Sequence, residues 1–291
     1  TDIAITPNGD IWIAFETKVI RFTPGSNELK EYSSIGHAQS AVPKVFLVAQ
    51  DGTLWGADIS IWNSDDIDIG LPVLSRYNAL TDQFEFVQDN QEILRNKEPF
   101  QRLFIVQEDN NGMLWGIAQI DNHDHLISFN PKTGDAEIHS IGLANSLLSS
   151  LAVGPDGSVW LSDYFWGQLI KYNRDSRQFS IEFENLQFAS ILEFSAKGLD
   201  NLYFDNQGRL WIEDRGWFDL SQNQMKWHNI NRSRVFITDN ATAENQYAWL
   251  RPYETYQSSD GTIWFSSQNG MIQYDPNISK WCLFTTYKGQ V

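Results

Sequence analysis

The sequence predicts an all-β fold made of six similar units, and three observations support this prediction. A turn phrase that ends in tryptophan occurs six times, as PNGDIW, QDGTLW, NNGMLW, PDGSVW, NQGRLW and SDGTIW. Short segments around each copy alternate apolar and polar residues, which is the two-residue period of a half-buried strand. Aromatic residues make up 14% and charged residues 20% of the chain. This composition supplies a packed core and excludes a disordered chain.

Each unit is predicted to run strand, turn, strand, loop, strand, turn, strand. The glycine of each phrase supplies the positive φ that a tight hairpin turn requires. The second pair of strands is clearest in VLSRYNALTDQFEFV (73–87) and QLIKYNRDSRQFSIEF (168–183). No segment has the pattern of a long helix.

Four-stranded units that recur at this spacing are typical of the blades of a β-propeller. A single blade cannot bury both of its faces, but stacked blades cover one another. We therefore predict one domain over residues 1–291, an all-β six-bladed β-propeller of four-stranded antiparallel blades. The predicted blades span approximately residues 3–32, 44–87, 102–141, 149–183, 199–230 and 252–286.

The repeated tryptophans are predicted to fill equivalent positions between blades, because a residue fixed in every repeat usually serves packing. The alternative is that they are aromatic platforms for ligands. They are Trp12, Trp55, Trp115, Trp160, Trp211 and Trp264. The first blade is expected to begin with its own inner strand near Ile3, and the last to end with its own outer strand near Phe284. Either the ring closes without strand exchange, or the sequence is an excerpt.

Charge and cysteine content restrict the partners. The formal net charge is −16, and no run of Lys or Arg offsets it, so binding to nucleic acid or to an anionic membrane surface is disfavoured. The single Cys282 excludes an intrachain disulfide and a zinc site built on several cysteines. No apolar run reaches the roughly 18 residues that a membrane span requires.

The phrases DGTIWFSSQNGMIQYDPNISKWCLF, DGSVWLSDYFWGQLIKYNRDSRQF and DGTLW with LSRYNALTDQFEF resemble the propeller repeats in the extracytoplasmic sensor regions of two-component regulators. They are similar, more distantly, to the streptogramin B lyase-like propellers. The first resemblance implies a sensor module outside the cytoplasm, periplasmic or extracellular, that signals to a partner domain. The second implies a catalytic pair of histidines with a glutamate just before one of them, and we carry none of these roles over to this chain.

A ligand is expected at the loops that follow the second strand of each blade and at the loops between blades, around the channel mouth. Aromatic side chains there stand close to carboxylates and arginines, which suits stacking on sugar rings or other flat neutral ligands. The alternative for Trp166 and Trp217 is packing onto neighbouring blades. The predicted ligand-binding residues are Trp62, Asp65, Asp163, Tyr164, Trp166, Glu213, Arg215, Trp217 and Arg251.

Two metal sites were considered. His123 and His125 lie two residues apart in DNHDH, so an extended strand would point both imidazoles the same way, toward one zinc-like ion. NSDDID has carboxylates at the density of a calcium loop but lacks the glycine and distal glutamate of an EF-hand. A plain polar loop is preferred in both places, so we expect no cofactor.

The sequence thus favours a non-enzymatic propeller that binds a small molecule or glycan and belongs to a larger signalling or exported protein. No catalytic residue is predicted, because the sequence has no nucleophile elbow, phosphate-binding loop or HEXXH helix. A lyase or hydrolase acting at the same loops is the first alternative. A protein-interaction scaffold, which would need a broad apolar patch, is the second.

Overall fold

The computed structural model divides the chain into two compact units, Thr1–Leu147 and Leu148–Val291. The structure describes residues 2–15, 18–32, 43, 45–57, 71–72, 74–87, 95–96, 100–120, 123–142, 147–163, 166–184, 202–212, 216–220, 224–227, 236–237, 252–267, 270–275 and 280–284.

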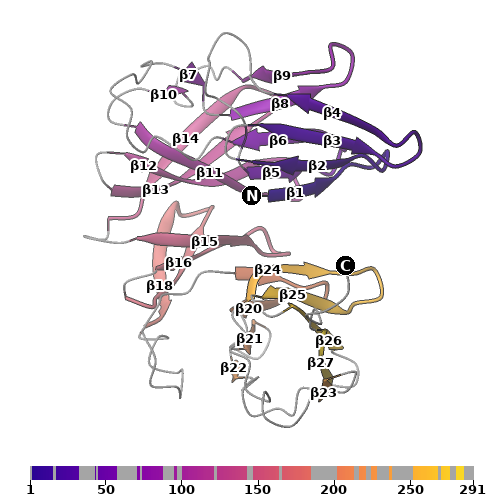
Figure 1. Cartoon of the computed structure of the whole chain (residues 1–291). Coiled ribbons are helices and arrows are strands. Elements are labelled where there is room, and N and C mark those ends of the chain that lie inside the picture. Colours follow the sequence, from indigo (N-terminus) through magenta and orange to yellow (C-terminus); the bar gives the residue numbers. More distant parts are fainter. Residues whose placement is uncertain are drawn as a thin grey trace. The chain divides into compact units, whose positions relative to one another are not determined.

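The first unit contains three four-stranded antiparallel sheets, each made of strands in chain order (Figure 1). Blade 1 consists of β1 (Asp2–Ile5), β2 (Ile11–Ala14), β3 (Val19–Thr23) and β4 (Glu28–Tyr32). Blade 2 consists of β5 (Val45–Val48), β6 (Leu54–Ala57), β8 (Leu74–Asn78) and β9 (Gln83–Phe86). Blade 3 consists of β11 (Phe100–Glu108), β12 (Leu114–Ile120), β13 (His123–Asn130) and β14 (Asp135–Ser140). A separate two-stranded sheet pairs β7 (Leu71–Pro72) with β10 (Arg95–Asn96).

The second unit contains the other three sheets. Blade 4 consists of β15 (Leu148–Val153), β16 (Val159–Asp163), β17 (Leu169–Asn173) and β18 (Gln178–Phe183). Blade 5 consists of β19 (Leu202–Phe204), β20 (Arg209–Ile212), β21 (Gly216–Asp219) and β22 (Gln224–Trp227). Blade 6 consists of β24 (Pro252–Gln257), β25 (Ile263–Ser267), β26 (Gly270–Asp275) and β27 (Lys280–Phe284). A short strand, β23 (Phe236–Ile237), adds to the outer edge of blade 6 in parallel with β27.

The predicted fold class is confirmed: the chain has the six antiparallel sheets of a six-bladed β-propeller, and the described residues contain no helix. Each blade uses four consecutive strands, and the observed blades end within a few residues of the predicted bounds. That both units form a single domain stays a prediction. The described part of the chain has no helix with the length and apolar character needed to cross a membrane.

The same hairpin turn joins the first two strands of every blade. In blade 1 the Thr6 N–H donates to the Asp10 carbonyl and the Gly9 N–H donates to the Thr6 carbonyl, and the other five turns repeat both bonds. The turn glycine has a φ between 75° and 88° in all six, a conformation that is strained for residues with a Cβ. The repeated glycine is therefore a backbone requirement of the turn.

In blades 1, 3, 4 and 5 the turn also supplies a partner for the indole N–H of the tryptophan that follows it. Trp115 and Trp211 donate to the carboxylates of Asp109 and Asp205, at 3.0 and 2.8 Å. Trp12 donates to the Thr6 hydroxyl at 3.3 Å and Trp160 to the Ser158 hydroxyl at 2.9 Å. These bonds let a large polar-tipped ring enter the core without a lost hydrogen bond.

In the first unit, the repeated tryptophans pack between one blade and the next. The Trp12 ring of blade 1 packs 4.5 Å from the ring of Tyr77, which lies on the third strand of blade 2. The Trp55 ring of blade 2 packs 6.1 Å from Phe129, which holds the same place in blade 3. Both tryptophans belong to the clusters that form the core between these blades. This confirms the predicted packing role.

The second unit repeats the arrangement. Trp160 of blade 4 lies 6.0 Å from Phe218 on the third strand of blade 5. Trp211 of blade 5 lies 5.2 Å from Tyr274 on the third strand of blade 6. The six tryptophans are not equivalent, however, because Trp264 is only half-buried.

Tyr203 forms a hydrogen bond between blades 5 and 6, and its pKa leads to a prediction about stability at high pH. Its hydroxyl donates to the Gln257 side chain at 3.1 Å, and burial, helped by Asp205 and Tyr256, raises the pKa of Tyr203 to about 12. A raised folded-state pKa stabilises the protein fully below the unfolded value of about 10, and this stabilisation disappears as the pH rises to about 12.

Because Tyr203 is partly exposed and solvent screens its interactions, we expect the wild type to lose on the order of 1 kcal/mol of stability relative to Tyr203→Phe between pH 10 and 12. Urea unfolding at several pH values measures this loss. A constant difference between wild type and Tyr203→Phe across that range would contradict the prediction.

Candidate functional site

Every blade has two ends with different connections. We call the ends that carry the connection between the second and third strands the loop ends, and the ends that carry the two hairpin turns of each blade the turn ends. The predicted ligand-binding residues belong to the loop ends and to the connections between blades. Six of them lie outside the described residues: Trp62, Asp65, Tyr164, Glu213, Arg215 and Arg251.

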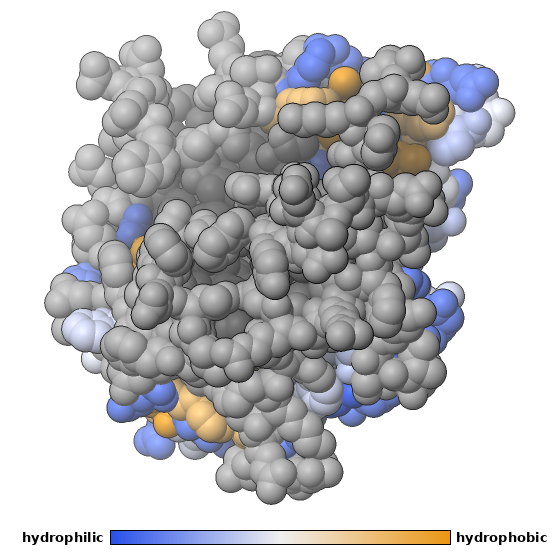
Figure 2. All heavy atoms as spheres, turned by 60° about the horizontal axis from the view of Figure 1, so that its bottom comes forward, coloured by the Kyte–Doolittle hydropathy of each residue, from blue (hydrophilic) through white to orange (hydrophobic). Residues whose placement is uncertain are grey.

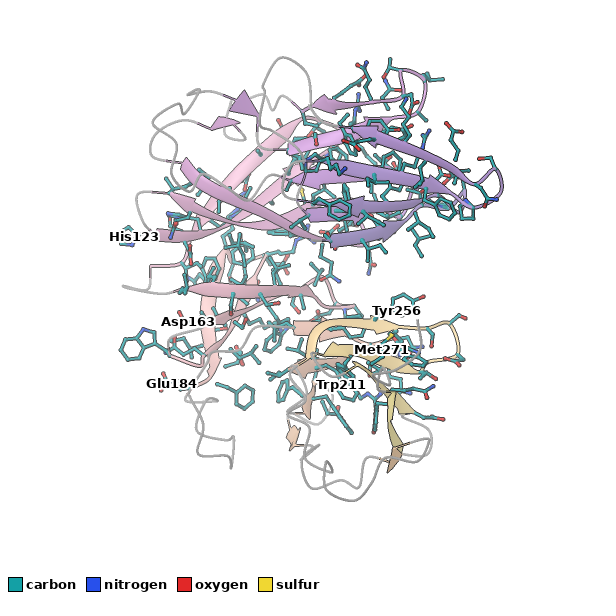
Figure 3. The ribbon with its side chains drawn as sticks, viewed as in Figure 1. His123, Asp163, Glu184, Trp211, Tyr256 and Met271 are labelled. Carbon is teal, nitrogen blue, oxygen red and sulfur yellow. The ribbon has the colours of Figure 1, made fainter. Side chains whose placement is uncertain are left out.

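Asp163 and Trp166 come together at the loop end of blade 4. Asp163 is the last residue of β16, as labelled in Figure 3, and it has no exposed surface. Its Oδ1 accepts a hydrogen bond from the Trp166 backbone N–H at 2.7 Å, and its own N–H donates to the Gln168 carbonyl at 2.9 Å. The Trp166 side chain is 54% exposed. Asp163 thus shapes the loop from inside, and Trp166 lies at its surface.

Trp217 occupies a different environment. It lies on β21, is 9% exposed, and packs 4.9 Å from Trp211 and 6.3 Å from Tyr274 of blade 6. The Arg209 guanidinium lies 4.9 Å from the centre of its ring. This is the alternative considered above, in which the ring packs on the neighbouring blade.

The two histidines considered as metal ligands lie on β13. His123 is its exposed first residue (Figure 3), and His125 follows two residues later, half-buried, opposite Ala118 of β12. Asp121 of the same motif lies outside the described residues. Within the described part of the chain, no three His, Cys, Asp or Glu side chains form a group that could hold a metal ion. The calcium-like NSDDID segment also lies outside that part.

The sequence contains one Glu-X-His, Glu137-Ile138-His139. It lies on β14, the outer strand of blade 3. The His139 ring stacks on Trp115 with ring centres 5.8 Å apart, and its Nε2 is 3.0 Å from the Ser128 hydroxyl. These contacts give His139 a packing role within its own blade.

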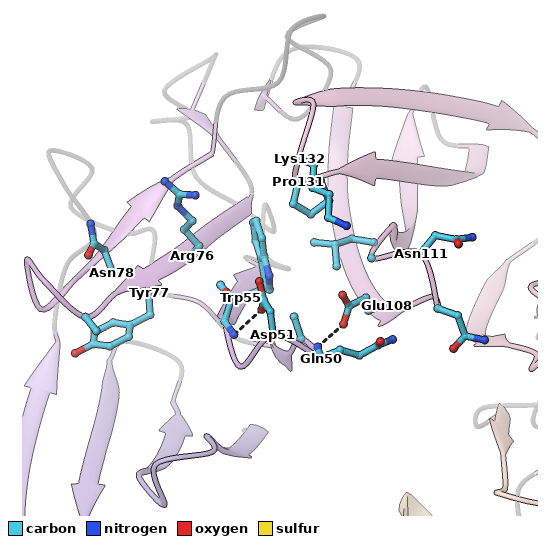
Figure 4. Close-up of a pocket in the computed structure, with 16 residues that line it drawn as sticks. Gln50, Asp51, Trp55, Arg76, Tyr77, Asn78, Glu108, Asn111, Pro131 and Lys132 are labelled. Carbon is cyan, nitrogen blue, oxygen red and sulfur yellow. Dashed lines mark hydrogen bonds between the residues drawn. The ribbon is translucent and has the colours of Figure 1, made fainter.

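A pocket of about 780 Å³ lies between blades 2 and 3, at their turn ends (Figure 4). Its volume is within the range of about 300 to 1,000 Å³ that holds small-molecule ligands. None of the ligand-binding residues predicted from the sequence lines it, because that prediction placed function at the loop ends. Its lining residues are Ala49, Gln50, Asp51, Thr53, Trp55, Arg76, Tyr77, Asn78, Ala79, Glu108, Asn110, Asn111, Gly112, Leu114, Pro131 and Lys132.

Gln50 fixes the two sides of this pocket relative to each other. Its backbone N–H donates to the carboxylate of Glu108, and its side-chain amide donates to the Asp109 carbonyl at 3.1 Å. Glu108, labelled in Figure 4, is the last residue of β11, and Asp109 begins the hairpin turn that follows it. The pocket therefore has walls held by hydrogen bonds before any ligand arrives.

One wall residue, Tyr77, also belongs to a charged network between blades 1 and 2. The Asp82 carboxylate accepts hydrogen bonds from Lys30, Tyr32 and Tyr77, and Arg21 lies 3.1 Å away. Burial opposes ionisation of Asp82, but these bonds and the Arg21 charge outweigh it and hold the pKa of Asp82 below its usual range. Burial, followed by the hydrogen bond to Asp82, raises the pKa of both tyrosines.

Figure 2 shows one face of the molecule, on which the described residues are mostly hydrophilic and the hydrophobic ones form small separate groups. The exposed large hydrophobic side chains are spread over several blades, and four of them, Ile3, Ile5, Phe15 and Leu29, belong to blade 1. Leu80 lies on the second hairpin turn of blade 2 and Tyr256 on β24.

Comparisons with known proteins give a likeness of fold. No family model matches the chain, and no curated protein matches it in sequence. Virginiamycin B lyase from Staphylococcus aureus is similar over 99% of this chain and 84% of its own, with 13% identity and a TM-score of 0.66. A catalytically inactive form of that lyase, solved with quinupristin, is similar over 98% and 83%, with 14% identity and a TM-score of 0.66.

The second group consists of extracellular domains from B. thetaiotaomicron that are assigned to hybrid two-component systems. One of them has 15% identity and a TM-score of 0.66, and the match covers 99% of this chain but 36% of that one. Another has 13% identity and a TM-score of 0.62, covering 100% and 35%. The chain thus shares its propeller fold with both groups that its repeats resemble, the lyases and the extracellular domains of two-component systems.

Proposed function

We propose that this chain is a non-enzymatic sensor module that binds a small molecule or glycan at its loop ends. It would act outside the cytoplasm, as part of a larger signalling or exported protein, and pass the binding signal to a partner domain. The fold that it shares with extracellular domains of two-component systems supports this proposal.

The observation that carries the proposal is the exposed indole of Trp166 on a loop held by a buried carboxylate. Large aromatic side chains are normally buried, and an exposed one on a shaped loop is typical of binding surfaces. The Asp163 side chain, with no exposed surface, accepts the hydrogen bond that places Trp166. The loop therefore presents a flat apolar ring at little entropic cost, which suits stacking on a sugar or another flat neutral ligand.

The test is a screen of glycans and small metabolites for an increase in melting temperature, because a ligand that binds only the folded protein stabilises it. We expect Trp166→Ala to weaken binding of each hit roughly thirtyfold, equivalent to an aromatic contact of about 2 kcal/mol. Asp163→Ala should also weaken binding, since it releases the loop while keeping the ring. Tyr256→Ala is the matched control, because Tyr256 is an exposed aromatic residue on a different strand.

Three outcomes would contradict the proposal. If the hits bind Trp166→Ala as tightly as the wild type, the loop of blade 4 is not part of the binding site. Stabilisation by a partner protein but by no small compound would favour the scaffold alternative. Chemical conversion of a hit, followed by mass spectrometry, would favour the lyase or hydrolase alternative.

A further inference from the structure

Blade 2 lacks the side chain that satisfies the repeated tryptophan in blades 1, 3 and 5. The residue six positions before the tryptophan is Thr6 in blade 1, Asp109 in blade 3 and Asp205 in blade 5, and each accepts the indole hydrogen bond. The residue at this position is Ala49 in blade 2 and Gly154 in blade 4, and neither side chain is an acceptor. Blade 4 uses the Ser158 hydroxyl instead, whereas Thr53, at the equivalent position of blade 2, forms no such bond. The turn itself is unchanged, with the same two backbone bonds.

Trp55, the tryptophan of blade 2, therefore lacks the acceptor that several of its equivalents have. Its side chain is 5% exposed, and among the described residues nothing accepts a hydrogen bond from its indole N–H. The indole nitrogen is nevertheless not sealed from solvent, in contrast to Trp217 Nε1. The N–H groups of the equivalent tryptophans in blades 1, 3, 4 and 5 are all satisfied within the protein. A donor that reaches a pocket and has no acceptor within the protein can bond to an acceptor on a ligand, and such polar groups fix a ligand's orientation.

The missing side chain also explains where the pocket lies. Ala49 and Trp55 both line it, and Figure 4 shows Trp55 among the pocket residues between the turns of blades 2 and 3. An oxygen placed beyond the Ala49 methyl group would take the position that carboxylate oxygens hold in blades 3 and 5. The pocket and the Trp55 donor therefore belong to one site.

The charges around the pocket select the chemistry of the ligand. Asp51 and Glu108 contribute two carboxylates, and Arg76 and Lys132 contribute two cationic groups. The formal charges cancel, so neither a free anion nor a free cation is attracted strongly. The lining instead offers both donors and acceptors, which suits hydroxyl groups because each hydroxyl both donates and accepts.

We propose that this pocket binds a neutral polyhydroxylated ligand of mono- or disaccharide size, with the Trp55 indole N–H donating to one of its oxygens. The site lies at the turn ends of blades 2 and 3 and is independent of the loop of blade 4. Binding here would survive Trp166→Ala, so failure of one site can be distinguished from failure of the other.

The experiment follows the indole N–H signals of the full chain labelled with ¹⁵N at tryptophan. The probes are D-glucose, D-galactose, cellobiose and lactose, each added up to about 50 mM to cover millimolar Kd values. Trp55→Phe identifies the Trp55 signal by its absence. We expect at least one probe to shift that signal, and Trp55→Phe to bind it about fivefold more weakly, as for the loss of one hydrogen bond.

Ala49→Asp is the most informative variant, because it introduces the carboxylate that blades 3 and 5 carry at this position. It should satisfy the Trp55 N–H internally, move its signal in the absence of any probe, and abolish probe binding. Leu80→Asp is the matched control, since it adds the same charge to the exposed second hairpin turn of blade 2 and leaves the pocket open. Leu80→Asp should bind like the wild type.

The proposal is overturned if no probe shifts the Trp55 signal, or if a shift persists unchanged in Ala49→Asp. Acetate and D-glucuronate serve as additional probes. If these anions shift the Trp55 signal and the neutral sugars do not, the assigned ligand class is wrong. If Trp55→Phe fails to fold, the comparison of Ala49→Asp with Leu80→Asp decides the outcome.

Discussion

Asp205→Ala is expected to destabilise the second unit by about 3 to 5 kcal/mol, the usual loss when one partner of a buried ion pair is removed. Asp205 is 3% exposed, and its Oδ2 accepts hydrogen bonds from Arg209 Nε at 2.6 Å and from the Trp211 indole at 2.8 Å. Its Oδ1 accepts the N–H groups of Gln207 and Arg209, which closes the turn. Alanine leaves all four donors without this acceptor.

Urea unfolding at pH 7 measures the effect, and two variants make it specific. Asp109→Ala removes the equivalent turn and indole bonds of blade 3. Met113 takes the place of the arginine there, so this variant breaks no ion pair. Its loss of unfolding free energy should be smaller than that of Asp205→Ala by the contribution of the ion pair. Asp260→Ala removes an exposed turn carboxylate and should change stability little. A loss under about 1 kcal/mol for Asp205→Ala would show that the buried carboxylate does not organise the turn.

Asp82→Asn is expected to weaken the first unit by about 1 to 2 kcal/mol at pH 7. The variant keeps the shape of the side chain but removes the charge that faces Lys30 and Arg21. The Asp82 side chain is 35% exposed, so solvent screens the pairs and the expected loss is smaller than for a fully buried ion pair. Glu31→Gln, which breaks the more exposed pair with Lys18, is the control and should have almost no effect.

The pH dependence gives a second check of the same network. Because the folded-state pKa of Asp82 is lowered, its stabilising contribution is present above the unfolded value of about 3.9 and is lost as the pH falls through the folded value. The difference in unfolding free energy between wild type and Asp82→Asn should therefore be constant from pH 7 to about 5 and shrink below about pH 4. A difference that stays constant down to pH 2 would contradict the proposed electrostatic origin.

The repeated turns and strands could be predicted from the sequence because their signals are local. Glycine with positive φ, the following tryptophan and the two-residue period each act within a few residues, and together they indicate where each blade begins and ends. Burial of Trp12, Trp55, Trp115, Trp160 and Trp211 followed from the same repeat. Trp264 holds the same position but is only half-buried, since burial also depends on what a neighbouring blade provides.

The candidate site was less predictable, because its features depend on contacts between blades. Trp217 follows the loop-like residues EDRG, yet it is the second residue of β21 and packs against Tyr274 of the next blade. Asp163 was predicted to contact a ligand, and the structure gives it a buried hydrogen bond to the backbone of Trp166. The pocket at Ala49 arises from an absent side chain, which only an alignment of the six turn phrases could have indicated.

The parallel strand β23 could not be predicted for a different reason. It is two residues long, so it has no detectable period, and its partner β27 lies more than forty residues later in the chain, with Phe236 opposite Cys282. Its neighbouring residues, 238–251, include the predicted ligand-binding residue Arg251 and lie outside the described part of the chain.

The order of strands within the blades also bears on how the chain acquires its structure. Every four-stranded blade pairs strands that follow one another in its own stretch of chain, so most of its loops are short, and a blade can nucleate as its residues emerge from the ribosome. The longest of these loops joins β6 to β8 in blade 2. The pairing of β23 with β27 has a far larger sequence separation and must wait until blade 6 exists. In a hydrogen-exchange pulse during refolding, amides in the blade hairpins should therefore gain protection before those of Phe236 and Ile237.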